Sequence, residues 1–428
     1  MINFNLLHPR DQIVAIMQRI YGYGMTTTSG GNLSVLDYNG DIWISPAGVD
    51  KGSLKPEDIV CVKQDGTVQG IHRPSSEFPF HKAIYESRGD IRAILHAHPA
   101  ALVSFSIVRK IPDTDVLSTA RQICGKVGYA PYAIPGSAQL GENIAGVFGR
   151  GHDTVLLENH GVVTSGESIL QAFQRFETLD FCARLIIKAN ILGRPYQLTQ
   201  AQIDLSYVKR NYLPEFEPHT HSSREKELRK KMKELVLRSY DQMLITSTEG
   251  TFSARVDENS FIITPFGQDR KCLDIEDFVL VENGRREAGK LPSRSVLMHE
   301  AIYKKHSDIN AIILAFPPNM MAFAVSCTPF DTRTIPESYI MLRDIPSMPF
   351  GTQYLGLDKL AGTIGREAPL ALIENDCLIC TGVDLLQAFD RLEVAEFSAK
   401  AIISAKVLGE VVPINAAQTE DLKRVFLS

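Results

Sequence analysis

The sequence lacks both a strong excess of one charge and a long apolar run. It has 45 Lys and Arg residues against 50 Asp and Glu, a formal net charge of −5, with only one local basic cluster at residues 224–233. This balance gives no reason to expect binding to nucleic acid or to an acidic membrane surface. No window reaches the roughly eighteen apolar residues of a membrane span. The N-terminal residues also lack a signal-peptide pattern, so we expect neither a membrane protein nor a secreted one.

Cysteine is scarce, and its spacing indicates no disulfide framework. The seven cysteines are an odd number and lie scattered, mostly in apolar runs, as expected of reduced thiols in the cytoplasm. Cys377 and Cys380 form a C-x-x-C pair without a second pair or a histidine cluster, so we interpret both as buried thiols. The chain also has no P-loop, and no G-x-G-x-x-G opens a βαβ unit, so dinucleotide binding is not indicated.

The chain carries one pattern twice. Three pairs of segments match, at shifts of 219, 218 and 216 residues: 42–62 with 261–281, 81–85 with 299–303, and 170–193 with 386–409. This period is too long for a solenoid repeat, and each copy is large enough for its own core. We therefore predict two tandem domains of one fold, residues 1–218 and 219–428, joined by the polar segment 214–224.

Within the first copy, the apolar periodicity alternates between helix and strand. It predicts helices over residues 9–23, 76–88 and 168–192, and strands over 41–45, 59–63, 91–98 and 154–157. Ser76 is predicted to open the second helix, with Glu77 in its first turn. A basic amphipathic helix is expected to begin near Lys226 and to lead into the second copy. Helices that cover a central sheet give a mixed α/β class.

Three histidines indicate a metal centre. His96 and His98 are one residue apart in a predicted strand, so their side chains point to the same face and can reach one ion. His160 follows the end of another apolar strand. Any one of them alone would be explained as a hydrogen-bonded core or surface residue. Together, three imidazoles with an open fourth position are what a catalytic zinc site needs, and we predict that His96, His98 and His160 bind one divalent ion.

The second copy provides an internal control, because residues needed only for catalysis can be lost from one copy. The positions aligned with the three histidines are Leu314, Phe316 and Asp376, so every predicted ligand has been lost. His81, by contrast, aligns with His299. We therefore interpret His81 as a structural residue.

Glu77 has been lost together with the histidines, since it aligns with Ser295. A partly desolvated carboxylate beside a divalent cation can act as acid and base near neutral pH. The simpler explanation is an acidic residue favoured by the dipole of a helix's first turn, but this does not account for the joint loss. We predict that Glu77 is catalytic.

Two segments are typical of an anion-binding cradle. The turn Ser29-Gly30-Gly31-Asn32 has backbone N–H groups that could face a phosphate, and Ser75 and Ser76 lie at a predicted helix start, where free amides favour negative charge. A glycine pair is also ordinary turn chemistry that needs no ligand. The cradle is therefore a weaker prediction than the metal centre.

Five motifs in order make the first copy resemble the class II aldolase/adducin family: GGNLS at Gly30, ISPAG at Ile44, PSSE at Pro74, HAHP at His96 and ENHG at Glu158. The resemblance implies that both copies are α/β/α sandwiches around a mainly antiparallel sheet. It implies Zn²⁺, or another divalent ion such as Mn²⁺, Fe²⁺ or Co²⁺, at the three histidines, and an acid/base role for Glu77. The substrate contacts that it implies are Gly31, Asn32, Gly48, Ser75 and Ser76.

The resemblance also implies an activity, that of a metal-dependent lyase. Such an aldolase cleaves or forms a C–C bond in a sugar phosphate or related hydroxy-keto acid through a metal-stabilised enediolate. Four alternatives stay open: a sugar-phosphate 4-epimerase, a sugar-acid decarboxylase, an iron-dependent oxygenase of the same fold and a non-catalytic adducin-like scaffold. Epimerases of the family commonly carry Asp where Glu77 stands, which favours an aldolase or a decarboxylase, and the intact histidines argue against a scaffold.

The sequence departs from the family pattern at two positions that bear on the expected substrate. Leu117 stands where fuculose-phosphate aldolase has a proton-donating tyrosine, although Tyr339 and Arg343 of the second copy occupy the corresponding loop, and Ala47 replaces a hydroxyl residue that helps to hold phosphate. The substrate need not be fuculose phosphate.

Enzymes of this family usually form four-fold rings with active sites at subunit borders. We therefore expect a homodimer that builds a pseudo-four-fold ring, in which the second copy could lend Tyr339 or Arg343.

Overall fold

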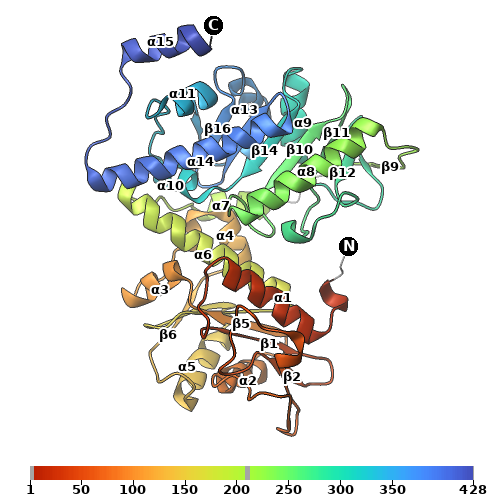
Figure 1. Ribbon diagram of the computed structural model, residues 1–428, viewed down its shortest axis with the longest axis vertical. Coiled ribbons are helices and arrows are strands. Elements are labelled where there is room, and N and C mark those ends of the chain that lie inside the picture. The colour runs from red at the N-terminus through yellow and green to blue at the C-terminus, as the bar shows by residue number, and fades with distance from the viewer. Residues whose placement is uncertain (1–3, 208–212, 428) are drawn as a thin grey trace. The chain divides into compact units, whose positions relative to one another are not determined.

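The computed structural model describes residues 4–207 and 213–427, which form two compact units (Figure 1). Of the described residues, the first unit comprises 4–115 and 119–184, and the second comprises 116–118, 185–207 and 213–427. The division falls inside helix α6 (Ile169–Leu192), and the domain boundary at residue 218 stays a prediction. No helix among the described residues combines the length and apolar character needed to cross a membrane.

The first unit is organised around one sheet. Within the described residues it has eight strands in the order β4-β3-β2-β1-β5-β8-β7-β6, and all neighbours are antiparallel except β6 and β7. The bounds are β1 (Asn32–Leu36), β2 (Ile42–Ile44), β3 (Val60–Val62), β4 (Val68–Gln69), β5 (Ala93–Ala97), β6 (Gly128–Ala130), β7 (Thr154–Leu157) and β8 (Val162–Gly166). The predicted mainly antiparallel sheet is confirmed.

Helices cover both faces of this sheet, each over its own hydrophobic core. On one face lie α1 (Pro9–Gly22) and α6, and α1 buries Ile13, Ile16, Met17 and Ile20, which recur at helical spacing. On the other face lie α2 (Phe78–Ser87) and α5 (Ala138–Phe148), which share a second buried cluster. The unit also contains α3 (Ala100–Ile107) and α4 (Ser118–Cys124), and the three-residue 3₁₀ helices Phe4–Leu6, Pro56–Asp58 and Thr114–Val116.

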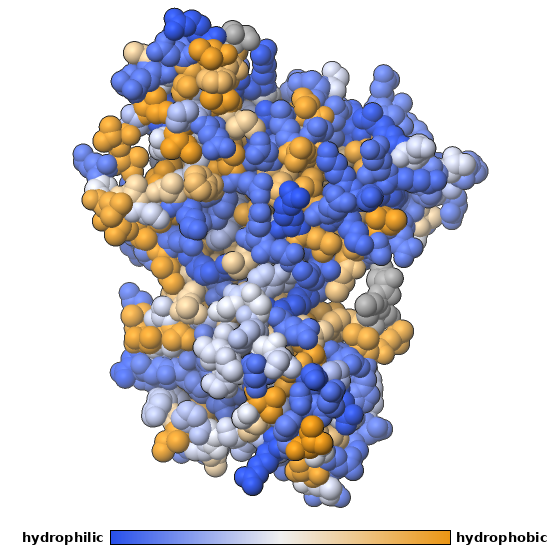
Figure 2. All heavy atoms as spheres, in the orientation of Figure 1, coloured by the Kyte–Doolittle hydropathy of each residue, from blue (hydrophilic) through white to orange (hydrophobic). Residues whose placement is uncertain are grey.

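The second unit repeats this arrangement. Helices α8 (Ser223–Asp241) and α14 (Leu385–Leu408) lie over one face of its sheet, and α9 (Val296–Lys305) and α13 (Leu357–Thr363) over the other (Figure 1). The remaining helices are α7 (Gln200–Tyr207), α10 (Pro318–Ser326), α11 (Pro336–Leu342), α12 (Thr352–Leu355), α15 (Ala416–Phe426) and the 3₁₀ helix Arg270–Cys272. Figure 2 shows apolar side chains gathered over the C-terminal end of α14, where Val407, Leu408 and Val412 are exposed.

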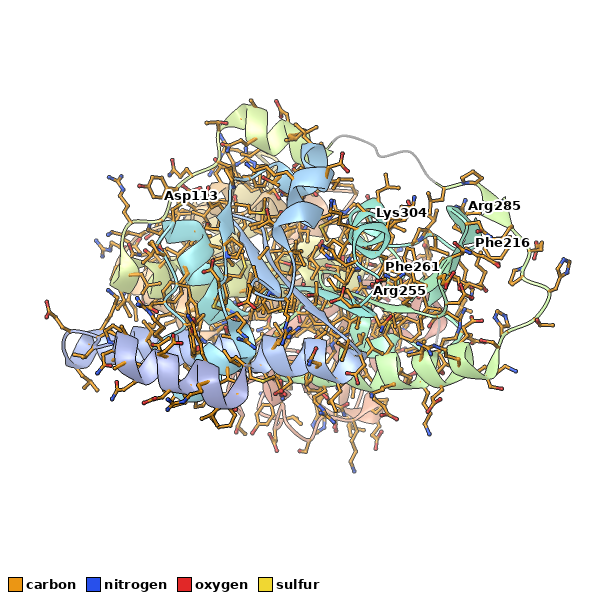
Figure 3. All side chains as sticks on the ribbon, turned by 90° about the horizontal axis from the view of Figure 1, so that it is seen from above. Asp113, Phe216, Arg255, Phe261, Arg285 and Lys304 are labelled. Carbon is orange, nitrogen blue, oxygen red and sulfur yellow. The ribbon has the colours of Figure 1, made fainter. Side chains whose placement is uncertain are left out.

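The second sheet has one strand more than the first. Within the described residues its order is β15-β16-β17-β14-β10-β11-β12-β13-β9, antiparallel except at the pairs β15–β16 and β13–β9. Its strands are β9 (Glu215–Phe216), β10 (Thr251–Arg255), β11 (Ser260–Ile263), β12 (Val279–Glu282), β13 (Arg285–Glu287), β14 (Ala311–Ala315), β15 (Ser347–Met348), β16 (Leu370–Ile373) and β17 (Cys377–Gly382). At this edge the Arg285 guanidinium lies 6.0 Å from the ring centre of Phe216 (Figure 3). Part of the predicted linker is therefore an edge strand.

Two local predictions are wrong. Ser76 does not open the helix at residues 76–88, because α2 begins at Phe78 and Glu77 is the residue before it, with no capping hydrogen bond from its side chain. Tyr339 does not lie in a loop, since it is part of α11, which Arg343 ends. Leu117 is buried and apolar and so cannot replace a proton donor. The α/β/α class itself is confirmed in both units.

Candidate metal centre

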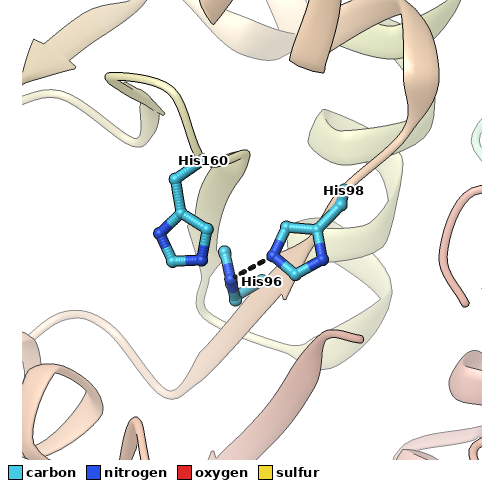
Figure 4. A group of neighbouring side chains, drawn as sticks. All are labelled: His96, His98 and His160. Atoms are coloured by element: carbon cyan, nitrogen blue, oxygen red, sulfur yellow. Dashed lines mark hydrogen bonds between the residues drawn. The ribbon is translucent and has the colours of Figure 1, made fainter. Parts of the chain in front are cut away.

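The centre lies where β5 ends in the first unit (Figure 4). His96 belongs to β5, His98 follows its last residue directly, and His160 lies in the turn between β7 and β8. Because β8 pairs with β5, with Val163 opposite His96, the turn that carries His160 is brought to the end of β5. The fold therefore assembles residues that are 64 positions apart in the chain.

The three histidines converge as predicted. One nitrogen of each lies within 4.8 Å of the others, and the Nε2 atoms of His96 and His98 are 3.0 Å apart, as the dashed line in Figure 4 marks. The ring centres are separated by 4.7 to 5.0 Å. Among the described residues, this is the group of side chains that could hold a metal ion.

The ring of His96 is held in one orientation. Its Nδ1 atom lies 3.0 Å from the main-chain oxygen of Val162, and a carbonyl oxygen can only accept a hydrogen bond. Nδ1 therefore carries the proton, which leaves the lone pair of Nε2 directed at the cluster. A hydrogen bond from the ring nitrogen that faces away from the cluster fixes the tautomer that a metal-binding histidine needs.

The charge state of the histidines suits a cation. Burial lowers the pKa of His96 well below its ordinary value, and the neighbouring rings of His98 and His160 lower it further. Burial also lowers the pKa of His98 and of His160. All three rings are therefore neutral near pH 7, and the neutral imidazole is the form that binds a metal.

Two glycines allow the close packing around the histidines. A Cβ atom on Gly161 would lie 2.6 Å from the main-chain oxygen of Ala97 and equally close to the ring of His98. Gly31 adopts a left-handed conformation, with φ at 75°, and its Cβ would approach the main-chain oxygen of His96 to 2.8 Å. Any side chain at either position would push the loop away from the centre.

Glu77 faces the same cluster. Its Oε2 lies 3.3 Å from Nε2 of His96 and its Oε1 lies 3.5 Å from Nε2 of His160. The carboxylate is buried, and Oε1 has no hydrogen-bond partner among the described residues. An unpartnered buried carboxylate oxygen beside three neutral imidazoles is a donor set that fits a divalent cation.

The position of Asn32 is a feature that the sequence analysis missed. Asn32 is the first residue of β1 and lies opposite His96 in the register of β1 and β5. Its amide Nδ2 donates to Oε2 of Glu77 at 2.7 Å, and its Oδ1 accepts from Nε2 of His81. From the sequence, Asn32 was expected to contact the substrate as part of the anion cradle, whereas its amide is bonded to Glu77 and His81. The antiparallel pairing of GGNLS with the HAHP strand is the signal that would have placed it here.

Of the other predicted substrate contacts, Gly31 lies in the loop before β1, and Gly48, Ser75 and Ser76 lie in two neighbouring loops. The bridge between Pro46 and Pro74 ties their segments together, and this arrangement brings the loop of Gly48 beside Ser75. Ser75 is buried and its Oγ accepts from the amide of Glu77 at 3.3 Å. Gly48 and Ser76 are exposed, and their contact with a substrate stays a prediction.

The second unit keeps the frame of this site without its ligands. β14 occupies the place of β5, with Leu314 within it and Phe316 just beyond it. Asp376 lies in the turn between β16 and β17. All three side chains are buried. The predicted loss of the ligands from the second copy therefore agrees with the positions of these residues in the fold.

Comparison with known protein families agrees with the fold and the histidine cluster described above. The family model of the Class II Aldolase and Adducin N-terminal domain matches residues 11–187 and again residues 230–403. These two segments cover most of the chain, so the protein belongs to this family and carries its domain twice.

Three known proteins illustrate what the chain is similar to. It is 34% identical over 200 residues to the 5-deoxy-D-ribulose 1-phosphate aldolase of Bacillus thuringiensis, a match over 46% of this chain and 92% of that one. It is 32% identical over 188 residues to the 3-oxo-tetronate 4-phosphate decarboxylase of Pectobacterium atrosepticum, over 43% and 84%. A solved structure of an L-fuculose 1-phosphate aldolase matches at 32% identity and a TM-score of 0.42, over 46% and 93%.

Proposed function

We propose that this protein is a metal-dependent lyase of the aldolase type, which cleaves or forms a C–C bond in a sugar phosphate or a related hydroxy-keto acid. One observation carries the proposal: His96, His98, His160 and Glu77 converge in one cluster. Membership of the family supports it, as do the names of relatives that act on sugar phosphates.

In this proposal the three imidazoles hold one divalent ion. Zn²⁺ is the first choice, because three neutral histidines with an open position are a common catalytic zinc site, and Mn²⁺, Fe²⁺ and Co²⁺ are the alternatives. When bound, such an ion supplies a Lewis acid that draws charge from an oxygen of the substrate. The rings are held for this task by packing and by the hydrogen bond from His96 to Val162.

Glu77 is the proposed acid and base. Asn32 occupies its Oε2, so Oε1, which has no partner among the described residues, is the oxygen that accepts and returns a proton at the reacting carbon. The amides around Gly31, Gly48, Ser75 and Ser76 are proposed to hold the anionic end of the substrate. Asn32 contributes through its bond to Glu77.

The test is a screen of ketose phosphates and sugar acids with the wild-type protein and two variants. Glu77→Gln should keep its metal and lose turnover by about 10²-fold or more, because it removes the proton-transferring group. Glu86→Gln is the matched control, since Glu86 lies on α2, the helix that Glu77 directly precedes, and has an exposed carboxylate, and it should be fully active. Unchanged turnover in Glu77→Gln would remove Glu77 from the mechanism.

A decarboxylase is the second candidate, favoured by the similarity to the 3-oxo-tetronate 4-phosphate decarboxylase. The same centre could stabilise the negative charge that forms when a carboxylate next to a carbonyl leaves as CO₂. Product analysis separates the two reactions. Release of CO₂ from a 3-oxo acid phosphate without an aldehyde product would establish decarboxylation and would contradict the aldolase assignment.

A further inference from the structure

A buried row of hydrogen bonds leads from α2 to β1 in the first unit. The hydroxyl oxygens of Ser34 and Tyr85 are 2.7 Å apart, and Oγ of Ser34 lies 2.7 Å from Nδ1 of His81. His81 is fully buried, and burial lowers its pKa to about 3. The ring is therefore neutral, so one of its nitrogens donates a hydrogen bond and the other accepts one.

The second unit has the same row of three side chains. Oγ of Ser253 lies 2.7 Å from Nδ1 of His299 and 2.8 Å from the hydroxyl of Tyr303. The presence of this triad in both copies shows that it belongs to the fold. It also agrees with the interpretation of His81 as structural.

The two triads differ at the other ring nitrogen. Nε2 of His81 is bonded to Asn32, whereas Nε2 of His299 is buried without a hydrogen-bond partner among the described residues. The residue at the position of Asn32 in the second copy is Thr251, whose hydroxyl is bonded to Ser293 instead. The link beyond the histidine is thus present only in the copy that has the metal-binding residues.

The amide of Asn32 gives the row a direction. Its Oδ1 can only accept, so Nε2 of His81 carries the ring proton and Nδ1 accepts from the hydroxyl of Ser34. Its Nδ2 donates to Oε2 of Glu77 at 2.7 Å. Every donor from Tyr85 onwards therefore points toward the carboxylate, and aligned hydrogen bonds of this kind strengthen one another.

We propose that His81, acting through Asn32, is a positioning residue for Glu77. It fixes the amide of Asn32, which holds Oε2 of the carboxylate and leaves Oε1 directed at His160. A structural triad of the fold has in this way been extended to orient the acid/base. The inference rests on the proposed function of Glu77 and adds the residues that keep its carboxylate in place.

The test uses variants that replace one ring nitrogen at a time. His81→Asn retains a polar group near Nδ1 and removes the link to Asn32, whereas His81→Gln places an amide near Nε2. His81→Asn should lower kcat by about tenfold to a hundredfold, with KM and metal content unchanged, and His81→Gln should recover part of this loss. His299→Asn is the matched control, since it makes the same substitution in the triad whose Nε2 has no partner among the described residues, and it should leave kcat unchanged.

Several results would overturn the inference. They are a His81→Asn kcat within twofold of wild type, a loss of metal in step with activity, or an equal loss in His299→Asn. Nitrogen-15 NMR of the histidine rings gives a readout without substrate, in which His81 should be protonated at Nε2 and a proton at Nδ1 would contradict the proposal. If Glu77→Gln is fully active, the proposed function fails. If Glu77→Gln is inactive but His81→Asn is fully active, only the positioning role of His81 is contradicted.

An independent observation concerns a cavity of about 360 Å³ in the second unit. Three arginines line it, Arg343, Arg366 and Arg391, against one acidic residue, Asp308. Apolar side chains such as Ile340 and Phe426 form part of its wall. The cavity therefore carries an excess of positive charge.

Arg391 has lost a counter-ion that its counterpart keeps. In both copies this arginine donates through Nε and Nη1 to two main-chain carbonyls, at 3.2 and 2.6 Å for Arg391 and at 3.3 and 2.6 Å for Arg175. Nη2 of Arg175 also forms an ion pair with Asp153 at 2.8 Å. The corresponding position is Pro369, whose carbonyl accepts the same strand hydrogen bond as that of Asp153.

Arg343 is an arginine in a position that suits glycine. The residue after α4 is Gly125, with φ at 63°, and the residue after α11 is Arg343, with φ at 58° and ψ at −118°. The two correspond, because each carbonyl accepts from a threonine hydroxyl, Thr114 in one copy and Thr332 in the other. A side chain in this conformation is strained. Burial lowers the pKa of Arg391, and the charge of Arg343 also lowers it.

We infer that this cavity binds an oxyanion, either a phosphate or a carboxylate. Strain and like-charge repulsion are both unfavourable in the free protein, and an oxyanion between the guanidinium groups would offset them. Among the described residues, the side chains of Arg343 and Arg366 form no hydrogen bond or ion pair, so their donors are free for such a ligand. Arginine is suited to bind either anion through paired N–H groups.

Thermal unfolding with phosphate, with succinate and with NaCl at the same ionic strength tests this inference. The wild-type Tm should rise by about 2 to 4 °C more in phosphate or succinate than in NaCl, and the arm with the larger rise identifies the class of anion. Arg343→Gly restores the residue of the first copy, so it should raise Tm without an anion and lose this extra rise. Arg366→Gln should weaken the rise without repairing the backbone.

Arg285→Gln is the control for net charge, because Arg285 is exposed on β13 in the same unit, and it should respond like wild type. The first copy's predicted cradle is intact in every variant, so binding there remains constant across the series. Equal phosphate and succinate responses in wild type and Arg343→Gly, or no response beyond that to NaCl, would overturn the inference.

Discussion

Asn159 and Asn375 occupy the same left-handed backbone position in the two copies, with φ at 51° and 54°. Each comes two residues after the strand next to one edge of its sheet, β7 or β16, and each is followed directly by the residue at the site, His160 in one copy and Asp376 in the other. The turn is therefore a property of the fold, whereas the metal-binding side chain that it presents is a property of the first copy alone.

Substitution of Asn159 tests the left-handed conformation of this turn. Asn159→Ala should lower the free energy of unfolding by about 1 to 2 kcal/mol relative to Asn159→Gly, because alanine is disfavoured in the left-handed region and glycine is not. Urea unfolding of the two variants measures this difference. In Asn375 the same pair of substitutions should give a similar difference, and equal stability of the Ala and Gly variants would show that the turn bears no such strain.

Loss of a histidine should remove the metal without unfolding the protein. His98→Gln should retain below about 0.1 ion per chain after purification, because two remaining imidazoles make a much weaker site. His306→Gln is the control outside the cluster, and it should keep one ion. Chelation of wild type should lower Tm and that of His98→Gln should not, since only a bound ion stabilises the folded state. Full metal occupancy in His98→Gln would exclude His98 as a metal ligand.

Much of the site could be predicted from sequence because its signals are local. The spacing of His96 and His98 in an apolar strand fixes their common side, and the two copies reveal which residues were lost together. The role of Asn32 could not be predicted in this way, because it depends on the pairing of β1 with β5. The start of α2 was misplaced because Ser76 is a favoured cap residue, whereas in the structure Pro74 is held by its bridge to Pro46 and a turn through Ser76 and Glu77 precedes the helix.

Stability should fall in mild acid because of the buried histidine of the second copy. Burial lowers the pKa of His299 to about 3, so the folded protein keeps it neutral, while the unfolded chain takes up a proton below about pH 6.5. Its contribution is complete above pH 6.5 and is lost as the pH falls toward 3, with a slope of up to about 1.4 kcal/mol per pH unit.

Urea unfolding of wild type and His299→Gln between pH 7.5 and pH 4.5 measures this slope. The variant is expected to be less stable at pH 7.5. The slope of its unfolding free energy against pH should be smaller, by the amount that corresponds to the uptake of about one proton. Parallel curves for the two proteins would mean that His299 is protonated in the folded state as readily as in the unfolded chain.

The duplication predicts a homodimer in which two chains complete a pseudo-four-fold ring. Each chain has a mass of 47.5 kDa, and light scattering after gel filtration should give about twice this value at micromolar concentration. The exposed apolar side chains at the end of α14 support burial against a second copy, because monomers rarely expose such a cluster. Val407, Leu408 and Val412 are 71%, 90% and 85% exposed.

Leu408→Lys combined with Val412→Lys should shift this dimer toward the monomer, since a charge in a buried apolar contact is unfavourable. Val68→Lys is the control, because Val68 is 48% exposed on an edge strand of the first unit, and it should stay dimeric. If the second copy also completes the site, the monomeric double variant should lose turnover while it keeps its metal. A stable wild-type monomer at micromolar concentration would rule out the ring and leave the second copy without a role in assembly.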